Sequence, residues 1–180
     1  MIHYFGIDES CNFDVYRNRE KKRPFTLVLC HSVDSSEVIE NESLLKDRAF
    51  NRRNFESNFL YSFTWKDFTS SSVMIDLFVE GYKRFCSPPD EICVYCDGDR
   101  QGSLLNEHLI RYISASISPF FNFCWGRSTR YPILRRADNL ANIISFYHGT
   151  SHDYEPRKSH FRRCYPTLDA RLKKCLVDVT

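Results

Sequence analysis

The chain has 180 residues, of which 42% are hydrophobic and 27% charged, and its formal net charge is +2. This composition is ordinary for a soluble globular protein and excludes an intrinsically disordered chain. No apolar run approaches the ~18 residues that a transmembrane helix needs, and the start of the chain lacks the basic and apolar regions of a signal peptide. We therefore expect one soluble, cytoplasmic domain without a membrane partner.

The pattern of apolar residues predicts strands and helices along the whole chain. In chain order, it predicts a strand over Ile2–Ile7, a strand over Phe25–Val33, a helix near Glu37–Phe50 whose start signal is Asp34-Ser35-Ser36, a helix after Thr69–Ser72 that Pro88-Pro89 closes, a strand over Ile92–Cys96, a helix over Leu104–Ile113, a strand over Phe120–Trp125, a helix over Ala137–Tyr147 and a final helix near Leu168–Leu176. Strands come first and then alternate with helices, which indicates a mixed α/β sheet with helices on its faces.

Basic residues gather in the last third of the chain. Seven of them lie between Arg157 and Lys174 against one acid, Asp169. We expect residues 1–150 to form the domain and residues 151–180 to be a basic C-terminal extension of it. Interleaved aromatic residues suit phosphate contact and base stacking, so a nucleic-acid partner is one interpretation and a solvated tail is the other.

The eight cysteines are expected to be reduced thiols, several of them buried. Cys93 and Cys96 have the spacing of metal ligands. On a strand, however, two residues three apart point to opposite faces, which opposes joint zinc binding. A zinc-stabilised interaction module is therefore the weakest of the alternatives.

Three aspartates lie where ligands gather in α/β proteins. Asp8 ends the first strand, Asp97 ends the central strand with Asp99 two residues on, and Asp138 begins the helix Ala137–Tyr147. If the two strands are parallel neighbours, Asp8 and Asp97 emerge at the same end of the sheet. Small or short polar residues follow Asp138 on one helix edge, so this edge can lie close to the sheet.

Carboxylates that are brought together repel one another and raise each other's pKa, and bound divalent cations remove that penalty. Hard oxygen ligands suit Mg²⁺ or Mn²⁺, and two such ions ~3.5–4 Å apart stabilise both reacting oxygens in phosphodiester cleavage. We therefore predict a Mg²⁺ or Mn²⁺ centre held by Asp8, Asp97 and Asp138. The structural alternatives are a polar turn for Asp97 and Asp99, and a dipole-favoured helix start for Asp138.

Three sequence motifs carry these aspartates: YFGIDES at 4–10, VYCDGD at 94–99 and RADNLA at 136–141. The first resembles the Asp-Glu-Ser-Gly opening of a bacterial and phage family of RNase H-like proteins, and the other two are similar to that family's second and third acidic motifs. The resemblance spans most of the chain. It implies an α/β fold of the ribonuclease H and RuvC-like superfamily, with an RNase H-like mixed sheet flanked by helices, and metal-dependent hydrolysis of nucleic acid.

The chain departs from this pattern at two points. Cys11 replaces the glycine that follows the first motif, and the helical glutamate of the ribonuclease H site has no clear counterpart. Glu9 is the nearest candidate for that fourth carboxylate. Asp76 and Glu80 share a helix face, but Glu80 also precedes Arg84 by four residues, which favours a solvated ion pair.

The leading hypothesis is a Mg²⁺- or Mn²⁺-dependent nuclease, in which Glu9 or Asp99 assists the three aspartates. Candidate residues for holding a substrate phosphate are the arginines that surround the start of the Asp138 helix. They are Arg127, Arg130, Arg135 and Arg136. The alternative is a catalytically inactive RNase H-like module that binds nucleic acid or protein. DNA, RNA and a hybrid duplex are all open as substrates.

Overall fold

A computed structural model describes residues 1–10, 23–41, 50–65, 72–97, 115, 121–128 and 130–178. The elements, in chain order, are β1 (Ile2–Ser10), β2 (Phe25–Ser32), the 3-10 helix η2 (Ser35–Val38), α1 (Arg52–Glu56), β3 (Asn58–Thr64), α2 (Ser72–Phe85), β4 (Glu91–Asp97), β5 (Phe121–Gly126), α4 (Pro132–His148), the 3-10 helix η3 (His152–Tyr154), α5 (Glu155–Cys164) and α6 (Leu168–Cys175). No helix among these is long and apolar enough to cross a membrane.

The five strands form one mixed sheet in the order β3-β2-β1-β4-β5. β2 runs antiparallel to both of its neighbours, whereas β4 is parallel to β1 and β5 is parallel to β4. β1 is therefore central and has a parallel neighbour on one side and an antiparallel neighbour on the other. This arrangement confirms the predicted α/β class with a mixed sheet flanked by helices.

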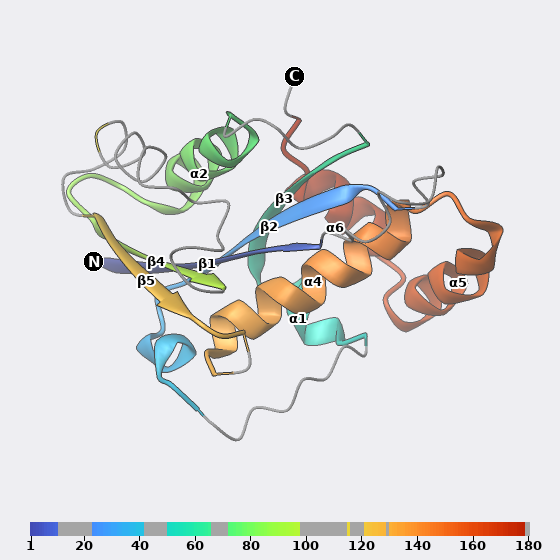
Figure 1. The fold of residues 1–180 in the computed structure, drawn as a ribbon, viewed down its shortest axis with the longest axis horizontal. Helices are drawn as coiled ribbons and strands as arrows, with labels where there is room; N and C mark the ends of the chain where they lie inside the picture. The colour runs from blue at the N-terminus through green and yellow to red at the C-terminus, as the bar shows by residue number, and fades with distance from the viewer. Residues whose placement is uncertain are drawn as a thin grey trace.

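Helices cover both faces of the sheet (Figure 1). α2 packs on one face, where Phe5, Ile7 and Val94 join its apolar side in one core cluster. α4 crosses the other face, where a second cluster joins it to β2, β3, α5 and α6. Both faces of β1 and β2 are therefore covered, which explains why these strands are apolar almost throughout.

Several element boundaries differ from the prediction. β1 continues to Ser10, because its last residues pair with the start of β2. α4 begins at Pro132 rather than Ala137, since proline is well tolerated in the first turn of a helix. The start signal Asp34-Ser35-Ser36 does begin a helix, in which Asp34 accepts a hydrogen bond from the Ser36 amide, but this helix is the 3-10 helix η2, which ends at Val38. The region 42–49 and the predicted helix Leu104–Ile113 lie outside the described residues.

β3 and α5 were not predicted. The stretch before Trp65 combines a polar start with an aromatic strand, so that neither a period of 2 nor one of 3.6 dominates it. Residues beyond 150 form α5 and α6 rather than a solvated tail. Phe161, Leu168 and Leu172 are buried in the same core cluster as Phe55 and Ile144, which packs the basic extension onto the α4 face of the sheet.

Candidate carboxylate site

Asp8 lies inside β1, on the face that α4 covers. Strand residues alternate between faces, and Phe5 and Ile7 belong to the α2 side, so Gly6 and Asp8 point toward α4. α4 comes very close to β1 here, because a Cβ atom on Gly6 would lie 2.9 Å from both the Cγ1 atom and the carbonyl oxygen of Ile133. This close packing leaves Asp8 94% buried beneath the helix.

Asp97, the last residue of β4, lies beside Asp8. Ile7 pairs with Cys96 in the parallel register, so one residue further along both strands brings the two aspartates to neighbouring positions on the same face. The Ser128 amide, in the turn after β5, donates a hydrogen bond of 2.7 Å to Asp97 Oδ1. The turn that follows β5 therefore fixes the Asp97 carboxylate.

Asp138 approaches the same place from α4. It lies in the second turn of the helix and is 91% buried. Asn142, one turn later, donates its Nδ2 hydrogens to the carbonyl oxygen of Asp138 at 2.9 Å and to Asp138 Oδ1 at 2.8 Å. The helix edge of short polar residues that the sequence indicated thus faces the sheet, and Asn142 orients the carboxylate.

Asp97 and Asp138 both lie close enough to Asp8 for their negative charges to act on it. Burial, followed by the negative charges of Glu9, Asp97 and Asp138, raises the pKa of Asp8 from 3.8 to about 9. Asp8 Oδ1 accepts a hydrogen bond of 2.8 Å from the Glu9 amide. Asp8 Oδ2 is buried and has no hydrogen-bond partner within the described part of the chain. A buried oxygen without a donor, surrounded by carboxylates, is unfavourable unless a proton or a cation accompanies it.

The two assisting acids fall in different categories. Because side chains alternate along a strand, Glu9 points to the α2 face of β1. Burial and the charge of Asp97 raise the pKa of Glu9 there. It is close enough to act electrostatically on Asp8 and Asp97, so its assisting role stays a prediction. Asp99 lies outside the described residues, as does Cys11.

These side chains suit a divalent cation by their chemistry. Hard carboxylate oxygens are the preferred donors for Mg²⁺ and Mn²⁺, and the unpartnered Oδ2 of Asp8 provides one that no other described group uses. Within the described ranges, however, no three His, Cys, Asp or Glu side chains are already spaced as a closed metal site. The site is thus a group of converging carboxylates rather than a preformed cage.

The four candidate arginines differ in their surroundings. Arg130 and Arg136 form ion pairs with Glu40 at 2.7 Å and with Glu37 at 2.8 Å, which tie the start of α4 to η2 and the residues after it. Arg127 is exposed and immediately precedes Ser128, whose amide holds Asp97. Of the four arginines, Arg127 therefore lies nearest in sequence to a group that binds one of the three aspartates. Arg135 is half-buried at the start of α4.

The cysteines show the predicted strand geometry. Along β4, residues alternate between buried and half-buried, so Cys96 joins the α2-side core and Cys93 points to the other face. All seven cysteines in the described ranges are free thiols. The zinc hypothesis for Cys93 and Cys96 therefore has no support in the geometry.

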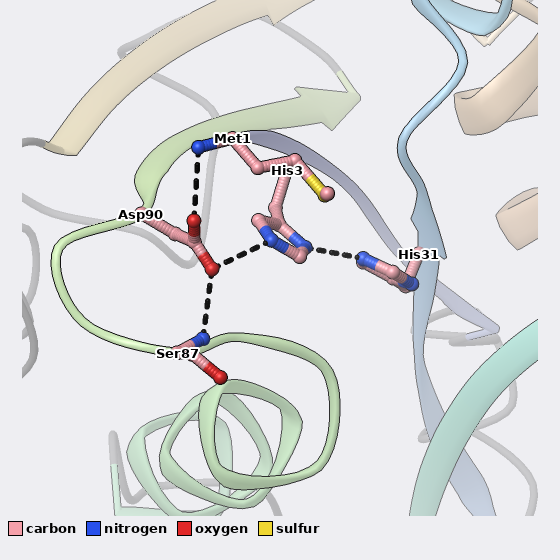
Figure 2. Close-up of polar contacts among 5 residues, drawn as sticks. All are labelled: Met1, His3, His31, Ser87 and Asp90. Atoms are coloured by element: carbon pink, nitrogen blue, oxygen red, sulfur yellow. Dashed lines mark hydrogen bonds and ion pairs between the residues drawn. The ribbon is translucent and has the colours of Figure 1, made fainter.

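A second polar cluster lies at the opposite end of β1, on the α2 face (Figure 2). His3 Nε2 is 3.0 Å from Asp90 Oδ2, and His3 Nδ1 is 2.9 Å from His31 Nε2. Asp90 can only accept, so His3 Nε2 carries a hydrogen, and in neutral His3 the Nδ1 atom accepts from His31. The rings of His31 and Phe85 stack 4.5 Å apart. This cluster ties the starts of β1 and β4 to the end of β2 and is separate from the carboxylates.

Acidification should weaken the fold through His31. Burial and the neighbouring His3 lower the pKa of His31 from 6.5 to about 4. Between these values the unfolded chain takes up a proton that the folded chain refuses, so His31 contributes stability above pH 6.5 that is lost as the pH falls toward 4. In urea titrations, the stability advantage of the wild type over His31→Asn should shrink by about 1–2 kcal/mol across this window. A pH-independent difference would contradict this assignment. His148, whose pKa is also lowered to about 4, remains in both proteins.

Similarity to known proteins is limited to solved structures. No protein-family model and no curated protein matches the sequence. One solved structure that resembles the chain is that of the PCNA:RNase HII complex from Archaeoglobus fulgidus. The similarity covers 98% of this chain and 97% of that chain, with a TM-score of 0.46 and 14% sequence identity. The strand order and directions of this chain's own sheet give it an α/β fold with a mixed sheet flanked by helices.

Proposed function

We propose that the chain is a metal-dependent nuclease that hydrolyses phosphodiester bonds of nucleic acid. The observation that carries the proposal is the buried, unpartnered Oδ2 of Asp8 in the middle of converging carboxylates. If Asp8 had only a structural role, we would expect a hydrogen-bond donor or a basic side chain beside its Oδ2 atom. The resemblance of the three acidic motifs to a bacterial and phage RNase H-like family supports the same assignment.

Asp8, Asp97 and Asp138 would hold Mg²⁺ or Mn²⁺. The ion would supply a positive charge that offsets the carboxylates and polarises the phosphate of the substrate. The chain's own groups orient the ligands: the amides of Glu9 and Ser128 each bind one carboxylate oxygen, and the Asn142 amide binds Asp138. These three donors are neutral amides, so they orient the carboxylate oxygens without adding a charge of their own.

The direct test is to incubate the protein with single-stranded DNA, duplex DNA, RNA and an RNA/DNA hybrid, in Mn²⁺, Mg²⁺ or EDTA. We expect cleavage of at least one substrate with Mn²⁺ and none with EDTA. Asp97→Asn should lower the rate at least about 100-fold, because it removes a ligand charge from the centre. Asp76→Asn is the matched control, since Asp76 is exposed on α2, and it should cleave at the wild-type rate.

The second candidate function is an inactive RNase H-like module that binds nucleic acid or protein. The absence of a preformed three-ligand cage among the described residues favours it. This module would bind nucleic acid equally well in Mn²⁺ and in EDTA, and would cleave none of the four substrates in either metal. That pair of results would replace the nuclease proposal.

A further inference from the structure

Tyr131, the residue before α4, places its ring against the backbone at the end of β5. A Cβ atom on Gly126 would overlap the Cε2 atom of this ring and lie 2.6 Å from its Cδ2 atom. Only a glycine leaves room for the ring at this place. The last residue of β5 therefore serves as the seat of an aromatic side chain.

The Tyr131 ring lies on the same face of the sheet as Asp97. Gly126 and Asp97 are partners in the parallel register of β4 and β5, so both positions face the same side. Neighbouring strands are ~4.8 Å apart, which puts the ring one strand away from the Asp97 carboxylate. α4 begins beside the ends of β4 and β5 (Figure 1), so the chain enters the helix next to the carboxylate site.

Tyr95 adds a second ring beside the first. It lies two residues before Asp97 on β4 and therefore points to the same face. Its ring centroid is 5.4 Å from that of Tyr131, with an angle of 51° between the ring planes. Both tyrosines are half-buried, so each keeps part of its surface open to solvent. Together they form an aromatic platform that adjoins the carboxylates.

An aromatic platform next to a site for phosphodiester bonds suits a nucleobase. Bases stack on tyrosine rings in proteins that bind single strands, and every base has a π face that can stack. In a nucleotide, one sugar separates the base from its phosphate, so a phosphate at the carboxylates brings a base close to the next strand. Arg127, exposed and directly after Gly126, adds a positive charge that suits the adjoining phosphate.

We propose that Tyr131, supported by Gly126 and Tyr95, stacks on the nucleobase of an unpaired nucleotide that adjoins the scissile phosphate. This inference rests on the proposed function for the position of that phosphate, but its test does not require cleavage. A base within a duplex is already stacked and paired, so the platform favours single-stranded or locally opened nucleic acid. Because stacking tolerates every base, we expect little preference for sequence.

The first test compares two fluorescein-labelled strands of about 20 nucleotides that carry the same phosphates, one of oligothymidine and one of abasic sites. Binding is followed by anisotropy in Ca²⁺, a hard cation that carboxylates bind, and a gel checks that the strands stay intact. Tyr131→Leu should weaken binding of oligothymidine about 5- to 100-fold, as for the loss of one stacked base, and change binding of the abasic strand less than about 2-fold.

Two further variants show whether the ring itself is responsible. Tyr131→Phe keeps the ring and should recover most of the affinity that Tyr131→Leu loses. Tyr82→Leu is the matched control, because Tyr82 is also a half-buried tyrosine but lies on α2, on the other face of the sheet. It should bind both strands within about 2-fold of the wild type.

A second measurement needs no substitution. A strand in which 5-iodouracil replaces thymine is irradiated with the wild-type protein, so that the uracil joins a contacting aromatic ring with loss of hydrogen iodide. Mass spectrometry then identifies the joined residue. We expect Tyr131, and this measurement decides the matter if circular dichroism shows that Tyr131→Leu does not fold. Joining only at other residues, or none at all, would overturn the inference.

The outcomes separate this inference from the nuclease proposal. An affinity loss in Tyr131→Leu that is confined to the strand with bases supports stacking, even if no substrate is ever cleaved. Equal losses for both strands would make Tyr131 a purely structural residue and overturn the inference, even if Mn²⁺-dependent cleavage is found. Wild-type affinity of a folded Tyr131→Leu variant for oligothymidine also overturns it.

Discussion

Replacing Asp8 with asparagine should abolish cleavage and metal binding while making the metal-free protein more stable. The native carboxylate is buried among Glu9, Asp97 and Asp138, and its Oδ2 has no donor among the described residues. Asparagine keeps the acceptor for the Glu9 amide and is neutral at every pH, whereas the aspartate must take up a proton to be neutral in the folded chain. We expect a gain of about 1–2 kcal/mol at pH 8, or ~2–8 °C in melting temperature.

The pH dependence of this gain follows from the raised pKa of Asp8. Between 3.8 and about 9 the folded chain retains a proton that the unfolded chain releases. Stability of the wild type therefore falls as the pH rises through this window, whereas Asp8→Asn lacks the effect. The difference in unfolding free energy between the two proteins should grow with pH and vanish below pH 3.8.

Thermal unfolding with and without Mn²⁺ measures both predicted effects of Asp8→Asn, which are the higher stability without metal and the loss of metal binding. Saturating Mn²⁺ should raise the melting temperature of the wild type and of Asp76→Asn, because the ion binds the folded state. It should leave Asp8→Asn unchanged, and the rate of cleavage by that variant should fall at least about 1,000-fold. A Mn²⁺ response in Asp8→Asn equal to that of the wild type would show that the ion binds elsewhere.

Replacing Gly6 with alanine should separate α4 from the sheet. The added Cβ would lie 2.9 Å from the Ile133 carbonyl oxygen and 3.0 Å from its carbonyl carbon, and backbone cannot yield as a flexible side chain does. Overpacking of this kind costs about 2–3 kcal/mol, although alanine is otherwise favoured over glycine in a strand. Since α4 carries Asp138, the variant should also lose much of its stabilisation by Mn²⁺.

Gly81→Ala provides the matched control on the other face of the sheet. Its added Cβ would lie 2.6 Å from the Cδ2 atom of Leu29, which is the end of a side chain with rotatable bonds and not backbone. Alanine is favoured in a helix by up to about 1 kcal/mol, so Gly81→Ala should stay within about 1 kcal/mol of the wild type and keep its Mn²⁺ response. Equal stability losses in the two variants would contradict the close contact between β1 and α4.

The sequence was sufficient to predict the aspartates because their positions follow from local patterns. Asp8 lies near the end of one apolar strand and Asp97 ends another, and alternation along those strands determines their face. Asp138 precedes Asn142 and Ser145 at helical spacing. Patterns of this kind depend on residues that are close in the chain. For the same reason, the predicted ends of β4, β5 and α2 lie within a few residues of the observed ends.

Contacts between distant segments could not be predicted in this way. Arg136 was a substrate candidate, yet it pairs with Glu37, 99 residues away. The donor to Asp97 is the backbone amide of Ser128, and a backbone amide leaves no signature in a sequence. Only the fold shows that Gly6 lies directly under α4.

The most direct test of the carboxylate centre is a crystal soaked in Mn²⁺ and measured for anomalous scattering. We predict an anomalous peak about 2.1–2.3 Å from Asp8 Oδ2 and within ligand distance of an oxygen of Asp97 or Asp138. The peak should be missing from Asp8→Asn crystals soaked in the same way. Wild-type crystals that show no manganese at these carboxylates, or manganese only at another place, would contradict the account.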